Sequence, residues 1–279
     1  MDRKLIFLDI DGTILAHGEE VHPAVLEGLR RARNKGHMVF ISTGRSHGSV
    51  PPEILDMETD GLICSAGSDI WFHGQNVYRQ SLSPELIEHT CQILKEMDAV
   101  YLLEGFDRIY VSEKAQRILL GKEVLPNDNP ELVRWKKYFR QKPNLYPIEE
   151  WTPDGEKVPK ITFMLFQKEQ VEKVKEIMSE HFHVVFFPAA YDDFWNGELI
   201  SRTADKGTAI QKAAELLHIG IEDTIAFGDS MNDYEMIEKA GCGVVMANGD
   251  EYLKTIADRI CESVQEDGVV RELERMHLI

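Results

Sequence analysis

The feature that most limits the fold of this chain is a series of short apolar runs separated by segments with helical spacing. Three such runs occupy residues 4–10, 37–42 and 61–65, and a segment that begins at Pro23 repeats its apolar residues at helical intervals as far as Gly36. Short runs rich in branched and aromatic side chains, bounded by turn residues, predict buried strands. Strand, helix and strand in this order predict a parallel sheet with helices on its faces.

The same alternation returns near the end of the chain, after a long stretch of different character. Helix, strand, helix and strand are predicted there at residues 206–217, 224–227, 231–240 and 243–247. The intervening stretch mixes helices and strands, predicted at residues 84–97, 161–166, 169–179 and 183–187. We therefore predict an α/β fold whose core is a Rossmann-like doubly wound parallel sheet, residues 1–82 and 198–279, with an inserted α+β domain, residues 83–197.

The balance of charge and the cysteines limit the partners and the compartment. With 31 basic and 48 acidic residues, the formal net charge is −17, which would repel nucleic acids and anionic membranes. The apolar run after Lys4 is shorter than a signal peptide requires, and no run approaches the roughly 18 residues of a membrane span. The cysteines form no zinc or disulfide pattern and stand at Cys64, Cys91, Cys242 and Cys261. We therefore predict a cytoplasmic protein without a nucleic-acid or membrane partner.

Two carboxylates stand at the end of the first predicted strand, in the sequence Asp9-Ile10-Asp11-Gly12-Thr13. Side chains two residues apart on a strand point to the same side, so Asp9 and Asp11 are expected to lie close together. Like charges this close need a cation or a proton, and a hard divalent cation such as Mg²⁺ suits oxygen ligands. The alternative is an Asp-Gly turn that only ends the strand.

A second acidic cluster follows a later predicted strand, in the sequence Gly228-Asp229-Ser230-Met231-Asn232-Asp233. If Asp229 lies at the start of a helix, Asp229 and Asp233 can face the same point, with Asn232 beside them. The alternative is a helix cap in which Ser230 or Asp229 accepts free backbone N–H groups. Because ligands of open α/β sheets gather at the carboxyl ends of the strands, both clusters together predict one metal site.

Two further segments suit a phosphate group. Ser42-Thr43-Gly44-Arg45 follows the second predicted strand, where Thr43, Gly44 and Arg45 offer a hydroxyl, turn N–H groups and a cation. Lys206 precedes a predicted helix start and adds one positive charge. Each segment also has an interpretation without a function. The first is then only a polar turn, and Lys206 is a solvated lysine. Taken together, a nucleophile, a metal and cationic donors are what phosphoryl transfer requires.

The order of these four motifs resembles that of the haloacid dehalogenase-like superfamily of aspartate-nucleophile phosphohydrolases. The insert after the third strand, about 115 residues long, and the stretch from Phe227 to Gly249 resemble the Cof-type branch more narrowly. The resemblance implies that Asp9 attacks phosphorus and becomes an aspartyl-phosphate, and that Asp11 protonates the leaving alcohol and then activates water.

The resemblance also implies a ligand set and phosphate contacts. Mg²⁺ would be held by the carboxylate of Asp9, the backbone carbonyl of Asp11 and the carboxylate of Asp229, with Asp233 in support. Thr43 and Lys206 would bind the transferred phosphoryl oxygens, and Asn232 would form a hydrogen bond near the phosphate.

One segment departs from the family pattern. Where this branch usually has Asn-Gly-Ala after the third strand, the chain has Ser65-Ala66-Gly67. The asparagine amide is missing and the glycine has moved by one position. The chain therefore cannot make a substrate contact through that asparagine amide, while the predicted nucleophile and Mg²⁺ sites are unchanged.

The inserted domain is expected to act as a cap that overhangs the sheet edge, excludes water and selects the substrate. Its segment 133–142 is basic and would attract an anion, or else forms a solvated helix whose Trp135, Tyr138 and Phe139 pack inward. Its segment 191–196 combines acids and aromatics, which suits sugar hydroxyls, or else is a polar turn into a core strand.

These observations predict a Mg²⁺-dependent phosphatase for a small phosphorylated metabolite, such as a sugar phosphate or a phosphorylated cofactor. One alternative is a phosphomutase, which uses the same nucleophile and returns the phosphoryl group to its substrate. Another is a metabolite-phosphate-binding regulator without catalytic activity. Such a regulator usually lacks the nucleophile or a metal ligand, whereas the candidate residues are all present here. The sequence makes no prediction of the oligomeric state.

Overall fold

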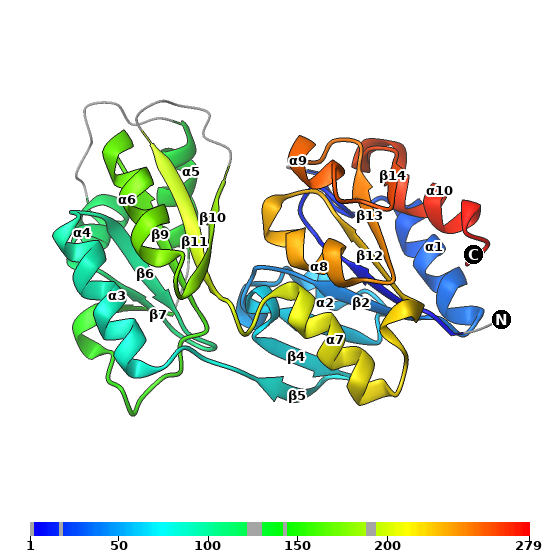
Figure 1. Ribbon diagram of the computed structural model, residues 1–279, viewed down its shortest axis with the longest axis horizontal. Helices are drawn as coiled ribbons and strands as arrows, with labels where there is room; N and C mark the ends of the chain where they lie inside the picture. Colours follow the sequence, from blue (N-terminus) through cyan, green and yellow to red (C-terminus); the bar gives the residue numbers. More distant parts are fainter. Residues whose placement is uncertain (1–2, 17–18, 122–129, 142–143, 188–193) are drawn as a thin grey trace. The chain divides into compact units, whose positions relative to one another are not determined.

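A computed structural model of the protein describes residues 3–16, 19–121, 130–141, 144–187 and 194–279. The chain forms two compact units, residues 1–80 with 203–279 and residues 81–202 (Figure 1). Each unit has its own sheet and its own apolar clusters. The predicted boundary between residues 197 and 198 falls inside a strand, Trp195–Ser201, which pairs along its length with the sheet of residues 81–202.

The first unit is built on an eight-stranded sheet in the order β14-β13-β12-β1-β2-β3-β4-β5. All pairs from β14 to β3 are parallel, and β4 and β5 extend the sheet as antiparallel strands. Successive strands run outward from β1 on one side and from β12 on the other, so the strand order reverses between them. The strands are β1 Leu5–Leu8, β2 Met38–Ser42, β3 Gly61–Cys64, β4 Asp69–Phe72, β5 Gln75–Arg79, β12 Thr224–Gly228, β13 Cys242–Met246 and β14 Arg259–Cys261.

Helices cover both faces of this sheet, which explains the unbroken apolar run of β1. Ile6 and Leu8 pack in one apolar cluster with α1 and α10, whereas Leu5 and Phe7 pack in another with α7 and α8. Figure 1 shows the sheet between these two pairs of helices. The α/β fold predicted from the sequence is confirmed. The helices are α1 Pro23–Asn34, α2 Pro52–Leu55, α7 Lys206–Leu217, α8 Tyr234–Lys239, α9 Glu251–Lys254 and α10 Gly268–Arg275.

The second unit has a six-stranded sheet in the order β10-β11-β9-β6-β7-β8, antiparallel except for the pair β7 and β8. Helices α3 and α6 pack on one face, and α4 and α5 pack on the other. The elements are α3 Pro84–Glu96, β6 Val100–Glu104, β7 Ile109–Val111, α4 Glu113–Ala115, α5 Pro130–Arg140, β8 Leu145–Pro147, β9 Lys160–Leu165, α6 Lys168–Met178, β10 Phe182–Phe186 and β11 Trp195–Ser201.

The basic segment of this unit lies on helix α5, which differs in two side chains from the solvated helix described above. Phe139 is buried as expected, but Tyr138 is 39% exposed and Lys136 is only 7% exposed. The reason is helical spacing, because Lys136 shares a face with Leu132 and Phe139, which lie four residues before it and three after it. Residues 191–193 of the aromatic and acidic segment lie outside the described residues.

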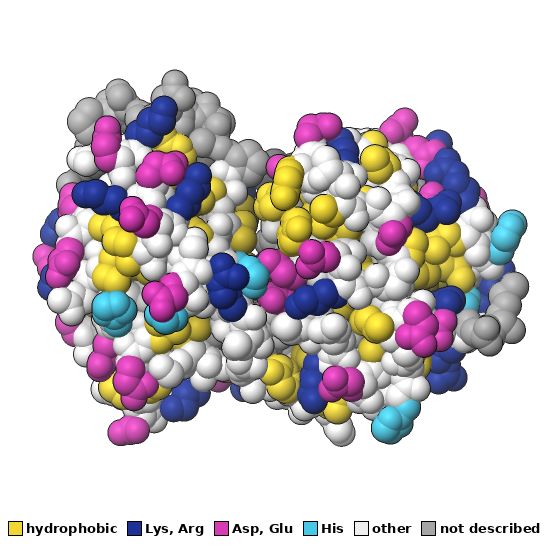
Figure 2. Space-filling view, in the orientation of Figure 1, with side chains coloured by type: hydrophobic (Ala, Val, Ile, Leu, Met, Phe, Trp, Pro, Cys, Tyr) yellow, Lys and Arg dark blue, Asp and Glu magenta, His cyan; other side chains and the backbone are white. Residues whose placement is uncertain are grey.

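Two observations concern nucleic acids and membranes as partners: the charges on the surface and the length of the helices. On the face drawn in Figure 2, Lys and Arg side chains of the described residues are interspersed with Asp and Glu over both units. None of the helices in the described parts of the chain has the length and the apolar composition needed to cross a bilayer.

Candidate active site

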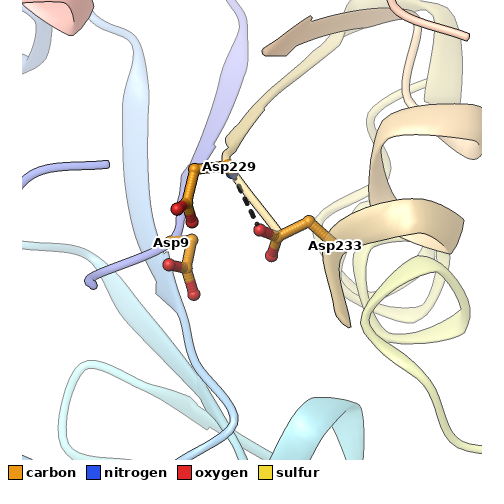
Figure 3. Close-up of side chains that lie close together, drawn as sticks. All are labelled: Asp9, Asp229 and Asp233. Atoms are coloured by element: carbon orange, nitrogen blue, oxygen red, sulfur yellow. Dashed lines mark hydrogen bonds between the residues drawn. The ribbon is translucent and has the colours of Figure 1, made fainter. Parts of the chain in front are cut away.

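Three aspartates meet at the carboxyl ends of the two central strands. Asp9 follows β1, Asp229 follows β12, and Asp233 lies on the 3-10 turn Met231–Asp233. Because β1 and β12 are neighbouring parallel strands, with Leu8 opposite Phe227, the residues after them lie at the same sheet edge. One carboxylate oxygen from each aspartate lies within 4.8 Å of the others (Figure 3). The two predicted acidic clusters therefore form one group.

The turns that carry these aspartates are closely packed. Gly12 has a φ of +88°, and a Cβ atom there would lie 2.2 Å from Oδ2 of Asp229, so only glycine fits this position. The backbone N–H groups of Asp229 and Ser230 donate to Oδ2 of Asp233 at 3.0 and 3.2 Å. This turn replaces the first part of the helix predicted at residues 231–240, and α8 begins only at Tyr234.

Lys206 connects two of the aspartates. It is the first residue of α7, whose N-terminus is capped by Asp205 in a reciprocal arrangement with Thr208. The Lys206 ammonium donates to Oδ1 of Asp9 and to Oδ1 of Asp233, both at 2.6 Å, and its side chain is fully buried. The lysine predicted to be a phosphate ligand therefore lies inside the carboxylate group.

Burial and mutual repulsion shape the electrostatics of this group. Burial raises the pKa of Asp9 to about 7, although the Lys206 ammonium opposes this rise. Burial, with the charges of Asp233 and Asp9, raises the pKa of Asp229 to about 8. Burial alone would lower the pKa of Lys206, but the charges of Asp233 and Asp9 raise it above its ordinary value. One ammonium does not balance three carboxylates, so the group favours a further positive charge.

The donor set fits a hard divalent cation. Oδ1 of Asp229 is buried and has no hydrogen-bond partner among the described residues. The available ligand atoms of Asp9, Asp229 and Asp233 are all carboxylate oxygens, which are the ligands that Mg²⁺ prefers. The Asp11 side chain is not in this group, because it is 57% exposed and its carboxylate is bound by Arg45. Its predicted contribution to the metal rests on its backbone carbonyl.

The other predicted residues surround this group in different ways. Thr43 is buried after β2, and its hydroxyl accepts the backbone N–H of Arg45 at 3.2 Å. Gly44 is half-buried between them. The Arg45 guanidinium donates to both carboxylate oxygens of Asp11, at 3.0 and 2.7 Å. The amide oxygen of Asn232 accepts the Ser230 hydroxyl at 2.8 Å within its own turn.

Comparison with known proteins identifies the family. Over residues 6–273 the chain matches the haloacid dehalogenase-like hydrolase family. The chain belongs to this family. It is 29% identical to the putative phosphatase YkrA of Bacillus subtilis, with 100% of both chains covered. It is 27% identical to the 5-amino-6-(5-phospho-D-ribitylamino)uracil phosphatase YitU of the same organism, covering 97% of this chain and 96% of that one.

A solved structure gives the same result for the fold. A haloacid dehalogenase-like hydrolase from B. subtilis superposes with a TM-score of 0.79 and 26% identity, covering 97% of this chain and 99% of that chain. The resemblance predicted from the motifs, including the Cof-type branch, is confirmed. This haloacid dehalogenase-like hydrolase is a phosphatase, which agrees with its family and with the names of its relatives.

Residues 65–67 of this hydrolase have a structural part that was not predicted from the sequence. Ser65 and Ala66 have φ values of 50° and 54°, and Gly67 has a φ of 109°. The N–H groups of Ser65 and Ala66 donate to the carbonyls of Arg45 and Thr43, at 2.8 and 3.1 Å. A Cβ atom on Gly67 would lie 2.1 Å from the Asp205 carbonyl oxygen. This turn therefore connects the Thr43 segment with the start of α7, and Gly67 is its visible signal in the sequence.

Proposed function

We propose that this phosphatase hydrolyses a phosphate monoester of a small metabolite, with Mg²⁺, through an aspartyl-phosphate intermediate on Asp9. The observation that carries the proposal is the convergence of Asp9, Asp229 and Asp233 with buried Lys206 at the carboxyl edge of the sheet. Small phosphorylated compounds are proposed because the relative YitU acts on a ribityl phosphate of a uracil. A sugar phosphate or a phosphorylated cofactor fits this class.

The chemistry proceeds in two displacements. In the first, a carboxylate oxygen of Asp9 attacks phosphorus, the bond to the leaving oxygen breaks, and Asp11 donates a proton to that oxygen. In the second, Asp11 takes a proton from water, the water oxygen attacks phosphorus, and phosphate leaves as the Asp9 carboxylate re-forms. Asp11 therefore ends each cycle protonated again, with a proton from water in place of the one that left with the alcohol.

The remaining residues hold the charges of the reacting group. Lys206 is already fixed on Asp9, so its ammonium neutralises charge where the phosphoryl group arrives. Thr43, Gly44 and Asn232 are proposed to donate hydrogen bonds to phosphoryl oxygens. Mg²⁺, held by Asp9 and Asp229 with Asp233 in support, would supply the positive charge that three carboxylates and a phosphate dianion require.

The first experiment measures phosphate release from 4-nitrophenyl phosphate, with Mg²⁺ and with excess chelator. We expect metal-dependent release that Asp9→Asn lowers by about 10³-fold or more, because the amide is not a nucleophile. Asp60→Asn is the matched control, since Asp60 is a buried aspartate that precedes β3 and so lies at the opposite sheet edge. It should retain the activity of the native protein within about threefold.

The outcomes of this experiment separate the alternatives. Retention of substantial phosphate release by folded Asp9→Asn would remove Asp9 from its proposed role. Steady release of free phosphate at every turnover would argue against a phosphomutase, which keeps water away from its aspartyl-phosphate. A cytoplasmic location and a capping role for the inserted domain stay predictions.

A further inference from the structure

Arg45 binds Asp11 through two nitrogens of its guanidinium group. Nε donates to Oδ2 at 3.0 Å, and Nη2 donates to Oδ1 at 2.7 Å. A guanidinium and a carboxylate paired in this way fix each other's plane as well as their distance. Both side chains are partly exposed, Asp11 at 57% and Arg45 at 30%, so burial alone does not impose this orientation. The pair itself sets the direction of the Asp11 carboxylate.

The backbone of Arg45 is held from both sides. Its N–H donates to the Thr43 hydroxyl, and its carbonyl accepts the N–H of Ser65. Ser65 and its neighbour Ala66 both adopt left-handed backbone conformations, which cost energy for residues with a side chain. Such conformations persist only where the surrounding structure enforces them. The turn at residues 65–67 therefore holds the base of the Arg45 side chain in place.

The distribution of charge around the site indicates what the pair of Arg45 and Asp11 does. Lys206 binds Asp9 and Asp233, so its ammonium is directed at those carboxylates and not at Asp11. Asp11 lies two residues from Asp9, and without a cation its carboxylate would be repelled by the acidic group. A general acid must lie within hydrogen-bond reach of the leaving oxygen, and a displacement of about 1 Å costs about a hundredfold in rate.

We propose that Arg45 is a positioning residue for Asp11: it holds the acid/base carboxylate at the rim of the site in the orientation used for proton transfer. The turn Ser65-Ala66-Gly67 supports Arg45 in this role. The inference rests on the proposed function, in which Asp11 protonates the leaving oxygen. It differs from the expectation drawn from the sequence, which placed Arg45 on the substrate phosphate.

The test compares two aryl phosphates whose leaving groups differ. Expulsion of 4-nitrophenolate needs little help from an acid, whereas phenolate is a poorer leaving group and needs a proton. For Arg45→Met, we expect the loss of kcat/KM to be larger for phenyl phosphate than for 4-nitrophenyl phosphate by about tenfold or more. Arg45→Lys keeps the charge without the paired geometry, so it should recover part of the loss and keep part of the difference.

Two further variants make the result decisive. Arg33→Met is the matched control, because Arg33 is 28% exposed and holds Asp60 through two nitrogens at the opposite sheet edge. It should change both substrates equally and slightly. Asp11→Asn should show the same preference for the better leaving group as Arg45→Met, and the double variant should be no worse than Asp11→Asn alone, because both changes remove the same step.

The outcomes show whether the acid role of Asp11 or the positioning role of Arg45 is wrong. If Asp11→Asn shows no dependence on the leaving group, the acid role of Asp11 in the proposed function is wrong. If Asp11→Asn shows the dependence and neither Arg45 variant does, the positioning role of Arg45 is overturned. An equal loss for both substrates in Arg45→Met, with weaker inhibition by inorganic phosphate, would instead place Arg45 on the phosphate.

Discussion

Each unit of this phosphatase contains a buried lysine bound to two carboxylates, and the two clusters differ in instructive ways. In the first unit, Lys206 binds Asp9 and Asp233. In the second, Lys160 binds Glu198 and lies 3.4 Å from Glu104. For Lys160, as for Lys206, burial alone would lower the pKa of the ammonium, but the two carboxylates raise it above its ordinary value.

The clusters differ in their position and in their balance of charge. Lys160 lies within β9 directly opposite Glu104 of β6, so neighbouring antiparallel strands supply its partners. Lys206 begins a helix at the carboxyl edge of a parallel sheet, where Asp229 adds a third carboxylate. A buried lysine with two carboxylates is therefore no sign of a reactive site by itself. An excess of negative charge at a sheet edge is the more telling feature.

Replacement of Lys206 should produce the larger effect on turnover. We expect Lys206→Met to lower kcat by about 10²- to 10³-fold, because it removes a cation directed at the nucleophile. The measurement is phosphate release from 4-nitrophenyl phosphate by protein that circular dichroism shows to be folded. A folded variant with kcat close to that of the native enzyme would make the two lysine clusters equivalent and break the comparison.

Replacement of Lys160 should affect stability and not chemistry. We expect Lys160→Met to destabilise the second unit by about 3–5 kcal/mol, because it leaves the buried Glu198 and the half-buried Glu104 without their cation. Urea unfolding measures this loss, and kcat of the remaining folded protein should stay within about threefold of the native value. A large fall in kcat without a loss of stability would assign the Lys160 cluster to the substrate.

Addition of Mg²⁺ should stabilise the protein through the Lys206 cluster and not through the Lys160 cluster. At about 100 times its Kd, a ligand of the folded state adds about 2.7 kcal/mol, which corresponds to a rise in Tm of about 5–10 °C for a protein of this size. Asp229→Asn should abolish most of this rise, whereas Glu198→Gln should leave it unchanged. Scanning calorimetry measures both, and an equal rise in native and Asp229→Asn protein would locate the cation elsewhere.

The last prediction concerns the dependence of stability on pH. Burial raises the pKa of Asp9 and of Asp229 from the ordinary 3.8 to about 7 and about 8 in the folded protein. Between about pH 4 and 8 the folded state therefore binds more protons than the unfolded state, so stability in chelator should fall as the pH rises. Thermal melts across this range measure the slope, which Asp229→Asn should reduce and Glu198→Gln should not. A flat profile for the native protein would contradict this.

Local sequence patterns were sufficient to predict the strands β1, β2, β3, β12 and β13 and the helices α1 and α7. Helix α7 begins and ends at the predicted residues, because Asp205 caps its start and its apolar residues repeat at helical intervals. The pattern was insufficient for β4 and β5, whose residues 69–79 mix polar and apolar side chains without a strand period. It also failed at β11, which is buried although it carries Asn196 and Glu198, because the sequence of a strand does not reveal which of two sheets it joins.

The sequence by itself determined the alternation of strands and helices, the acidic motifs at the ends of two strands and the family. These follow from spacing, because two or four residues of chain set which side chains share a face. Only the tertiary structure decided that Lys206 binds Asp233, that Arg45 binds Asp11 and that residues 65–67 support Arg45. Such contacts join residues far apart in the chain, and they depend on the order in which strands assemble into a sheet.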